Sequence, residues 1–363
     1  RDRGHWLGAR PIGGGVVIGA PFPYFGNKIK AAELVWSLLG DVPHYIEPFA
    51  GALGVLLNRP TPPRVETIND ADCFVSNFWR AVTLYPGETA AAADWPINEA
   101  DLHARHLELL AWGSDNKAKV MGSPEFCSPK MAGWWAWGLS SWIGSGWCSG
   151  QGPWSRSING EIVEDKNVLS QPVSRQISHI SGRQGVHVKR PQLTSRQGVH
   201  VKRPHLMSKK GTHSMSAVTD LDAWFALLCD RLQHVRVLCG DWSRSVTDGV
   251  TGERLTGVFL DPPYAASAQR APDLYAIDSL DVAHDAADWA LDRGASPQFR
   301  IVFAGFEGEH GSRFTDAGWS EHQWNAPKGL GAQKHRERLW ASPHCLSLSR
   351  ETLTLNLAFE GTS

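Results

Sequence analysis

Apolar and polar positions follow two regular patterns over the first 84 residues of the chain. Residues 44–47 and 65–69 are short extended runs bounded by turn residues, which predicts strands. Residues 27–39, 51–58 and 71–84 carry apolar side chains at helical spacing. Strands and helices that alternate over short connections are typical of a parallel sheet covered by helices.

The alternation stops near residue 85 and resumes at residue 220. A helix is predicted over 98–112, but the rest of this middle stretch has no comparable pattern. The second half predicts helices at 220–233 and 280–291, strands at 235–238, 258–260 and 300–304, and an antiparallel pair at 320–325 and 336–341 around a turn at 328–331.

These patterns predict a doubly wound α/β domain that is interrupted by a large insertion. The α/β domain comprises residues 21–84 and 220–345, and the inserted region comprises 85–219. Residues 1–20, rich in Gly, Pro and Arg, are expected to form a flexible lead-in, and residues 346–363 a C-terminal tail.

The charge of the chain is unevenly distributed, although its net value is only −1. Residues 166–219 contain ten Lys or Arg and no Asp or Glu, so the other 309 residues carry a net charge of −11. A basic block within an acidic protein is a candidate contact surface for nucleic acid. The alternative is a solvated insertion whose charge has no specific partner.

The basic block contains an internal repeat. Residues 183–193 recur at 196–206, and valines alternate with His and Lys in both copies, which predicts short extended segments. We expect the cations of this repeat to contact the phosphates of DNA. These cations are Arg183, Lys189, Arg190, Arg196, Lys202 and Arg203.

A Trp-rich stretch at residues 134–147 lies upstream of the repeat. Five Trp are interleaved there with Gly and Ser. Aromatic faces on an exposed, flexible backbone could stack on bases. Trp packed in the core of a helical subdomain is the alternative, and it is slightly favoured for any single Trp.

The composition favours a folded, soluble, cytoplasmic protein. Hydrophobic residues make up 42% and charged residues 20% of the chain, which excludes global disorder. No apolar run approaches the ~18 residues of a membrane span, and residues 1–10 lack the apolar core of a signal peptide. The six cysteines form no C-x-x-C pair, which favours reduced thiols over disulfides or a zinc site.

The candidate chemistry centres on Asp261-Pro262-Pro263-Tyr264, directly after the strand at 258–260. This is the carboxyl end of a sheet strand, the edge at which open α/β folds bind ligands. Pro262 has no N–H, so its carbonyl and the Asp261 carboxylate present acceptors to an amino group. Tyr264 offers a flat face against which a base could stack. A stiff turn at the strand end is the alternative.

Three N-terminal segments occur in an order suited to a nucleotide cofactor. Residues 24–28 (Tyr-Phe-Gly-Asn-Lys) come first, 46–54 (Ile-Glu-Pro-Phe-Ala-Gly-Ala-Leu-Gly) follow, and 67–70 (Thr-Ile-Asn-Asp) end the next strand. A Gly-rich turn between a strand and a helix lets backbone approach a ligand closely. Asp70, after the second strand, is placed to hold ribose hydroxyls. The turn lacks G-x-G-x-x-G spacing, which disfavours a plain nicotinamide cofactor.

With these motifs in this order, the chain resembles the Dam-type (alpha-group) DNA adenine methyltransferases, particularly phage-borne members. The resemblance covers residues 21–345 and is weakest across the inserted region. It implies a Rossmann-like, S-adenosylmethionine-dependent methyltransferase domain with an inserted target-recognition domain. The implied reaction transfers a methyl group to the exocyclic amine of adenine in double-stranded DNA, inside a bacterial host cell. No obligate protein partner is indicated.

The resemblance also implies two sets of site residues. The cofactor-binding set is Tyr24, Lys28, Glu47, Phe49, Gly51, Asp70, Asp241 and Asp261. The catalytic set is Asp261, Pro262, Pro263 and Tyr264, without a metal ion. The target base is expected to leave the duplex and to stack on Tyr264.

The sequence departs from the family at two positions, and two alternatives stay open. Asn27 and Leu53 stand where the family usually carries Gly. The amino group of cytosine presents similar donors to that of adenine. A DNA-binding protein built on a degenerate methyltransferase domain is the second alternative, although the intact Lys28, Asp70 and Asp261 argue against it.

Overall fold

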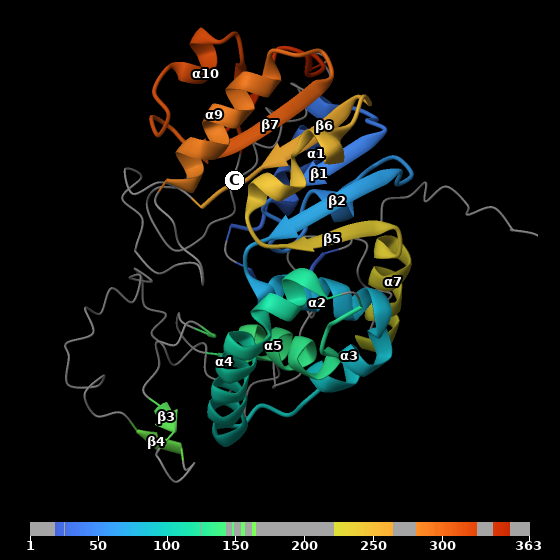
Figure 1. The fold of residues 1–363 in the computed structure, drawn as a ribbon, viewed down its shortest axis with the longest axis vertical. Helices are drawn as coiled ribbons and strands as arrows, with labels where there is room; N and C mark the ends of the chain where they lie inside the picture. The colour runs from blue at the N-terminus through green and yellow to red at the C-terminus, as the bar shows by residue number, and fades with distance from the viewer. Residues whose placement is uncertain are drawn as a thin grey trace, which may run out of the picture.

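The centre of the protein is a seven-stranded sheet with strand order β5-β2-β1-β6-β7-β9-β8, seen in the computed structural model of Figure 1. All strands of this sheet run in the same direction except β9, which pairs antiparallel with both β7 and β8. The predicted α/β class is therefore confirmed, and the sheet is compatible with a Rossmann-like fold. The structure describes residues 19–24, 26–123, 125–142, 147–148, 154–156, 162–164, 221–263, 281–324 and 337–348.

The elements have the following bounds. The strands of the large sheet are β1 (His44–Glu47), β2 (Val65–Asp70), β5 (Val235–Cys239), β6 (Thr256–Leu260), β7 (Phe299–Phe306), β8 (Ser320–Gln323) and β9 (Glu337–Ala341), and a separate antiparallel pair is formed by β3 (Trp154–Arg156) and β4 (Ile162–Glu164). The α-helices are α1 (Ala32–Leu39), α2 (Cys73–Leu84), α3 (Pro86–Ala93), α4 (Glu99–Gly122), α5 (Pro129–Ser141), α7 (Leu221–Leu232), α8 (Asp248–Thr251), α9 (Val282–Gly294) and α10 (Arg313–Asp316), and the 3-10 helices are η1 (Ile29–Ala31), η2 (Leu56–Asn58) and η6 (Trp242–Ser245).

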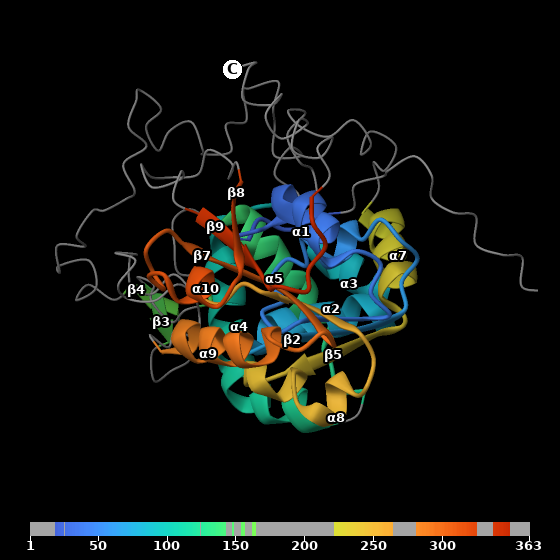
Figure 2. The same ribbon diagram turned by 90° about the horizontal axis from the view of Figure 1, so that it is seen from above.

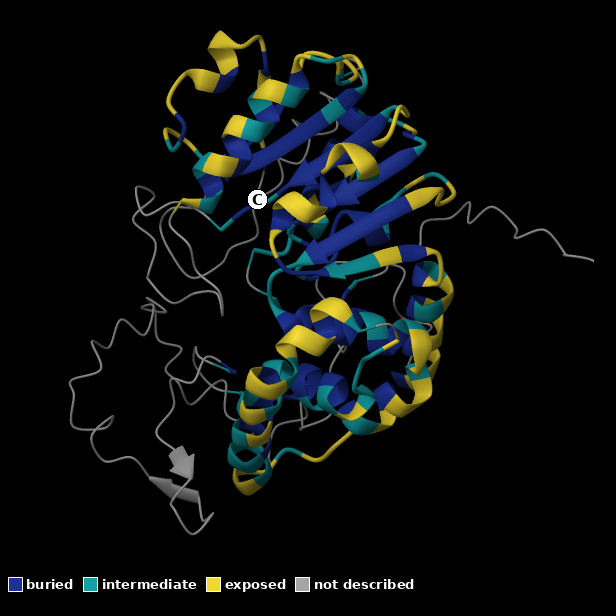
Figure 3. Cartoon of the chain, viewed as in Figure 1, coloured by how far each residue is buried: buried dark blue, intermediate teal, exposed yellow. Residues whose placement is uncertain are grey.

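Helices cover both faces of the sheet. Tyr45 of β1 and Phe259 of β6 belong to a hydrophobic core shared with α1 and α2, whereas their neighbours Ile46 and Val258 belong to a second core shared with α9. Alternation of this kind follows from the two-residue period of a strand. Figure 2 shows α1 and α9 on opposite sides of the sheet, and Figure 3 shows the central strands almost wholly buried between them. The central strands therefore have no solvated face, as in doubly wound folds.

One of the predicted helices in the first half is wrong. Residues 51–58 form a tight turn that ends in the short 3-10 helix η2. Leu53 takes a φ of 54°, a left-handed conformation that a right-handed helix cannot include. The other strands and helices predicted before residue 85 are confirmed, as is the final antiparallel pair β8–β9, whose predicted turn at 328–331 lies outside the described residues.

The middle stretch holds more regular structure than its pattern predicted. Helix α3 was not predicted, and α4 continues to Gly122, ten residues past the expected end. The Trp-rich stretch is the helix α5 up to Ser141, and Trp135 and Trp137 are 3% and 1% exposed. An exposed, flexible Trp-rich backbone is therefore wrong for these two side chains, and the helical-core alternative holds for them.

Helices α3 and α5 pack on each other and both contact α2, and α3 also contacts α7. The Trp135 ring lies 4.9 Å from Phe22 and 5.9 Å from Phe78 between centroids. Residues 86–141 therefore pack directly on helices of the α/β domain. None of the described helices is both long and apolar enough to cross a bilayer.

The buried His310 predicts a loss of stability in acid. His310 is 4% exposed, packs against the rings of Phe303, Phe314 and Trp340, and has no hydrogen-bond partner among the described residues. Burial lowers the pKa of His310 to about 4. The unfolded chain therefore binds more protons, and the free energy of unfolding should fall by up to about 3 kcal/mol as the pH drops from ~6.5 towards 4.

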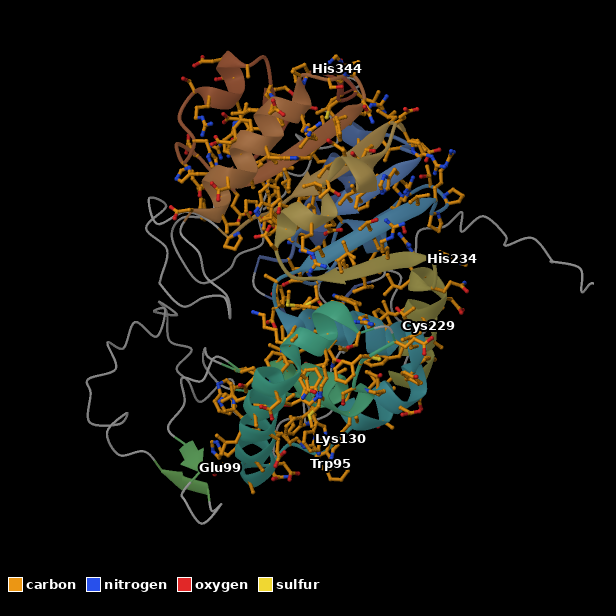
Figure 4. All side chains as sticks on the ribbon, viewed as in Figure 1. Trp95, Glu99, Lys130, Cys229, His234 and His344 are labelled. Carbon is orange, nitrogen blue, oxygen red and sulfur yellow. The ribbon has the colours of Figure 1, made fainter. Side chains whose placement is uncertain are left out.

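Denaturant unfolding at several pH values checks this expectation. In a His310→Leu protein the decline between pH 6.5 and 4 should be smaller by up to about 3 kcal/mol, and the other buried histidines, such as His106, whose pKa burial also lowers to about 4, account for the rest. The control is His234→Gln, because His234 lies exposed just before β5 (Figure 4). An equally steep decline in His310→Leu and in the wild type would contradict the assignment.

Candidate functional site

A pocket of about 360 Å³ opens at the carboxyl edge of the sheet. Strands β2 and β5 lie on one side of β1, and β6 and β7 lie on the other, so the strand order reverses between β1 and β6. Open α/β sheets bind ligands at such a switch point. The pocket wall comes from the stretch before η1, the turn after β1, the ends of β2, β5 and β6, and the first turn of α9.

The structure brings the predicted site residues together from distant parts of the chain. All eight members of the cofactor-binding set line the pocket: Tyr24, Lys28, Glu47, Phe49, Gly51, Asp70, Asp241 and Asp261. Of the catalytic set, Pro263 also lines the pocket, Pro262 is buried beside it, and Tyr264 lies outside the described residues. The six cations of the basic repeat lie outside the described residues as well.

Lys28 and Asp261 form an ion pair inside the pocket. The Lys28 Nζ lies 2.9 Å from each oxygen of the Asp261 carboxylate and donates a further hydrogen bond to the Gly26 carbonyl. The Lys28 side chain is 4% exposed, so the pair is screened little by water. Burial raises the pKa of Asp261, and the Lys28 charge acts against that rise. Lys28 therefore helps to keep Asp261 ionised.

The turn after β1 brings backbone into the pocket. Gly51 has a φ of 45°, and the Tyr24 ring lies against it, with Cε1 2.8 Å from the position of a Cβ. The Gly51 carbonyl accepts a hydrogen bond from the buried Trp79 Nε1 at 2.9 Å. Leu53, with its positive φ, is fully buried in the core beneath the turn. Its burial holds a conformation that costs a non-Gly residue roughly 1 kcal/mol or more.

Asp70 connects this turn to the end of β2. Its two carboxylate oxygens accept hydrogen bonds from the backbone N–H groups of Gly51 at 2.9 Å and Asp72 at 2.8 Å. Burial raises the pKa of Asp70 to about 6, and these two bonds oppose the rise. Asp72 accepts from the Phe74 N–H as the N-cap of α2, and burial raises its pKa to about 7. The pocket therefore holds two neighbouring carboxyl groups that titrate near neutral pH.

Aromatic side chains line another part of the wall. The rings of Phe49 and Trp242 stack at 28° with their centroids 6.0 Å apart. Asp241 lies beside them, is exposed, and caps η6 by accepting hydrogen bonds from the backbone N–H and the hydroxyl of Ser243. Stacked aromatic rings next to a carboxylate can hold a planar heterocycle and its polar edge.

Several residues of the pocket wall were not predicted as site residues, among them Asn69, Asp72 and Asp285. The Asn69 amide donates to the carbonyls of Pro48 and Gly240, and so ties together the ends of β1 and β5. The position of Asp72, directly before an apolar helix, is a helix N-cap signal that could have identified it. Asp285, on the first turns of α9, had no signal, because only the packing of α9 brings it to the pocket.

Gly54 predicts a sharp steric test of this pocket. A Cβ at Gly54 would lie 2.6 Å from the Ile29 backbone nitrogen and 3.1 Å from the Lys28 carbonyl carbon. Backbone atoms cannot relieve such a clash by changing rotamer, as a side chain can. Gly54→Ala should therefore displace Lys28 and weaken ligand binding in the pocket by roughly tenfold or more. The measurement is titration calorimetry with S-adenosylmethionine, the cofactor that the sequence resemblance implies.

Gly249→Ala is the control for this test, because a Cβ there meets no atom within 4 Å. It should bind as the wild type does. Unchanged binding by Gly54→Ala would mean that the approach of residues 28–29 to the turn does not shape the pocket.

No protein-family model matches the chain, and no curated protein matches it significantly. Any functional assignment therefore depends on the pocket and on the sequence motifs. Within the part of the chain that the structure describes, no three His, Cys, Asp or Glu side chains form a group that could hold a metal ion.

Proposed function

We propose that the protein is a site-specific DNA methyltransferase that transfers a methyl group from S-adenosylmethionine to the exocyclic amine of adenine. One observation carries the proposal. Side chains predicted from separate motifs to hold this cofactor converge on one pocket at the switch point of the sheet, next to Asp261. Random placement of eight such residues would scatter them over the molecule.

The pocket suits the chemical groups of this cofactor. Its volume lies within the ordinary range for small-molecule sites. The carboxylates of Asp70 and Asp72 offer acceptors for two ribose hydroxyls, and the rings of Phe49 and Trp242 offer a surface for the adenine. Carboxyl groups outnumber cations among the described lining residues, which favours a ligand with a positive charge. The bound cofactor supplies an electrophilic methyl group on a sulfonium.

Asp261 and Pro262 account for the acceptor side of the reaction. The adenine amine is a weak nucleophile because its lone pair is delocalised into the ring. Hydrogen bonds from this amine to the Asp261 carboxylate and the Pro262 carbonyl favour a pyramidal nitrogen with an available lone pair. The Lys28 charge favours the ionised form of this carboxylate. In-line orientation of the amine and the methyl group supplies much of the rate. The target base reaches this position only after it leaves the duplex.

The inserted region is assigned to DNA recognition under the same proposal. Its basic repeat supplies cations for phosphate contacts, and its described helices pack on the α/β domain through α2 and α7. The ion pair of Lys28 with Asp261 argues against a degenerate, purely DNA-binding protein, because the Lys28 charge favours the ionised form of the carboxylate that the proposed chemistry needs.

The test is transfer of a labelled methyl group from S-adenosylmethionine to unmethylated duplex DNA, followed by nucleoside analysis. Labelled methyladenine is the expected product. Methylated cytosine would keep the mechanism and change the base. DNA binding without any methyl transfer would contradict the proposal and favour the degenerate binding protein.

A further inference from the structure

The Glu47 carboxyl group has one oxygen fixed by the protein and one left for a ligand. Glu47 is 2% exposed. The Tyr45 hydroxyl and the Leu56 backbone N–H both donate to Oε2, each at 3.2 Å. Oε1 receives no hydrogen bond from the described residues, and Glu47 belongs to the pocket wall. A buried carboxyl group whose second oxygen faces a cavity can respond to the charge of whatever occupies that cavity.

The surroundings of Glu47 disfavour its charged form. Burial raises the pKa of Glu47 to about 8, and the negative charges of Asp261 and Glu66 act in the same direction. The hydrogen bonds from Tyr45 and Leu56 act against the rise. The charge of Lys28, the nearest pocket cation described, is already paired with Asp261. Glu47 therefore holds a proton at neutral pH in the ligand-free protein.

We propose that Glu47 exchanges a proton with solvent in step with the charge on the cofactor's sulfur. It releases one proton when the sulfonium form binds, and it takes one up when methyl transfer removes the positive charge. The inference rests on the proposed function, because it requires a methyl donor on a sulfonium beside Asp261.

The sheet places Glu47 close to the site of transfer. Strands β1 and β6 are neighbours, with Ile46 opposite Val258, so Glu47 and Asp261 lie at the ends of adjacent strands. An amine held by Asp261 must meet the methyl group in line with the carbon–sulfur bond, which puts the sulfur near both carboxyl groups. A positive charge within ~4–6 Å of a carboxyl group lowers its pKa by roughly 1–3 units, and a drop of about two units from the pKa of about 8 leaves Glu47 mostly ionised at pH 7.

The proton count of the reaction follows. The carbon–sulfur bond breaks with its electron pair left on sulfur, and the amine nitrogen bonds to carbon and loses one proton. Sulfur becomes a neutral thioether, so Glu47 regains its high proton affinity and takes up one proton. The transfer step thus leaves the number of protons in solution unchanged, and the proton appears in solution when the cofactor binds.

Proton linkage also predicts how affinity varies with pH. If a ligand binds only when Glu47 is ionised, its affinity rises about tenfold for each unit of increase in pH, as long as the pH stays below the pKa of Glu47. The ratio of the affinity for S-adenosylmethionine to the affinity for S-adenosylhomocysteine should therefore be about tenfold higher at pH 8 than at pH 6.5. Asp70 and Asp72 also titrate in this range, but the proposed function assigns them to the ribose, which both ligands share.

The experiment is titration calorimetry of the full-length protein with each ligand, in two buffers of different ionisation enthalpy. At pH 7, S-adenosylmethionine should release close to one proton more than S-adenosylhomocysteine does. The difference should vanish near pH 9, where Glu47 is already ionised. Glu47→Gln should abolish the difference, since its amide oxygen can still accept from Tyr45 and Leu56. The control is Glu33→Gln, which changes an exposed carboxylate on α1 outside the pocket and should retain the difference.

The outcomes separate this inference from the proposed function. Equal proton release for the two ligands in the wild type, or an undiminished difference in Glu47→Gln, would overturn the role of Glu47 while cofactor binding stands. If Glu47→Gln binds neither ligand, the pH profile of the wild-type difference decides: loss of the difference near pH 9 supports the role, and a constant difference overturns it. Failure of the wild type to bind S-adenosylmethionine would overturn the proposed function itself.

Discussion

Asp261→Asn is expected to reduce kcat for methyl transfer by roughly 10³-fold, the usual scale for removing a charged group that acts at the reacting atom. Asparagine keeps the size of the side chain and one acceptor oxygen. Its amide NH2 replaces the second acceptor with a donor, and so opposes the amine of the base and the Lys28 ammonium alike. The loss should lie mainly in kcat, because the proposed function assigns the ribose and the adenine to other side chains, Asp70, Asp72, Phe49 and Trp242.

The measurement is steady-state transfer to duplex DNA, with cofactor affinity determined separately. Glu33→Gln is the control, because Glu33 is an exposed carboxylate on α1 outside the pocket. Thermal unfolding of Asp261→Asn should accompany the assay, since the change leaves Lys28 buried without its charge partner. A folded Asp261→Asn protein that transfers methyl groups at more than a tenth of the wild-type rate would contradict the assigned chemistry.

The sequence predicted those parts of the fold that depend on local pattern. The strand β1, with the turn after it, and the end of β6 at Asp261 follow from short extended runs that stop at turn residues. The helix expected at 51–58 fails because Leu53 adopts a left-handed φ, which periodicity does not register. The turn is stable because Leu53 is buried in the core. Burial depends on the tertiary structure, so the local sequence pattern does not predict it.

Long-range packing explains the rest of what the pattern missed. Trp135 is buried by Phe22 and Phe78, which lie more than 50 residues away in the chain, so a Trp–Gly–Ser composition alone could not fix its environment. The contact of Lys28 with Asp261 spans 233 positions. Motif order could place both residues in a cofactor site, but only the folded sheet shows that they pair with each other.

The two halves of the α/β domain are joined by a buried ion-pair network. Glu66 of β2 accepts hydrogen bonds from Arg59, in the turn before β2, and from Arg231 of α7, which follows the middle stretch. The Glu66 side chain is 1% exposed. Arg231 also donates to the Leu56 carbonyl, and the Leu56 N–H donates to Glu47 in the pocket. The network therefore connects the return of the chain at α7 to the wall of the functional site.

Glu66→Ala should lower the free energy of unfolding by roughly 3 kcal/mol, because it leaves the largely buried Arg231 without a carboxylate partner and the buried Arg59 with only Asp41. Denaturant unfolding measures the loss. The control is Asp288→Ala, which removes the partner of Arg313 from an exposed ion pair and should cost less than about 1 kcal/mol.

Cofactor affinity is a second readout for Glu66→Ala, and it tests whether the ion-pair network influences the pocket as well as the stability of the fold. Since Arg231 reaches Glu47 through Leu56, the Glu66→Ala protein should also bind S-adenosylmethionine more weakly at temperatures where it remains folded. A loss of stability like that of Asp288→Ala would show that the two arginines find other partners. A large loss of stability with unchanged cofactor affinity would confine Glu66 to joining β2 and α7, with no influence on the pocket.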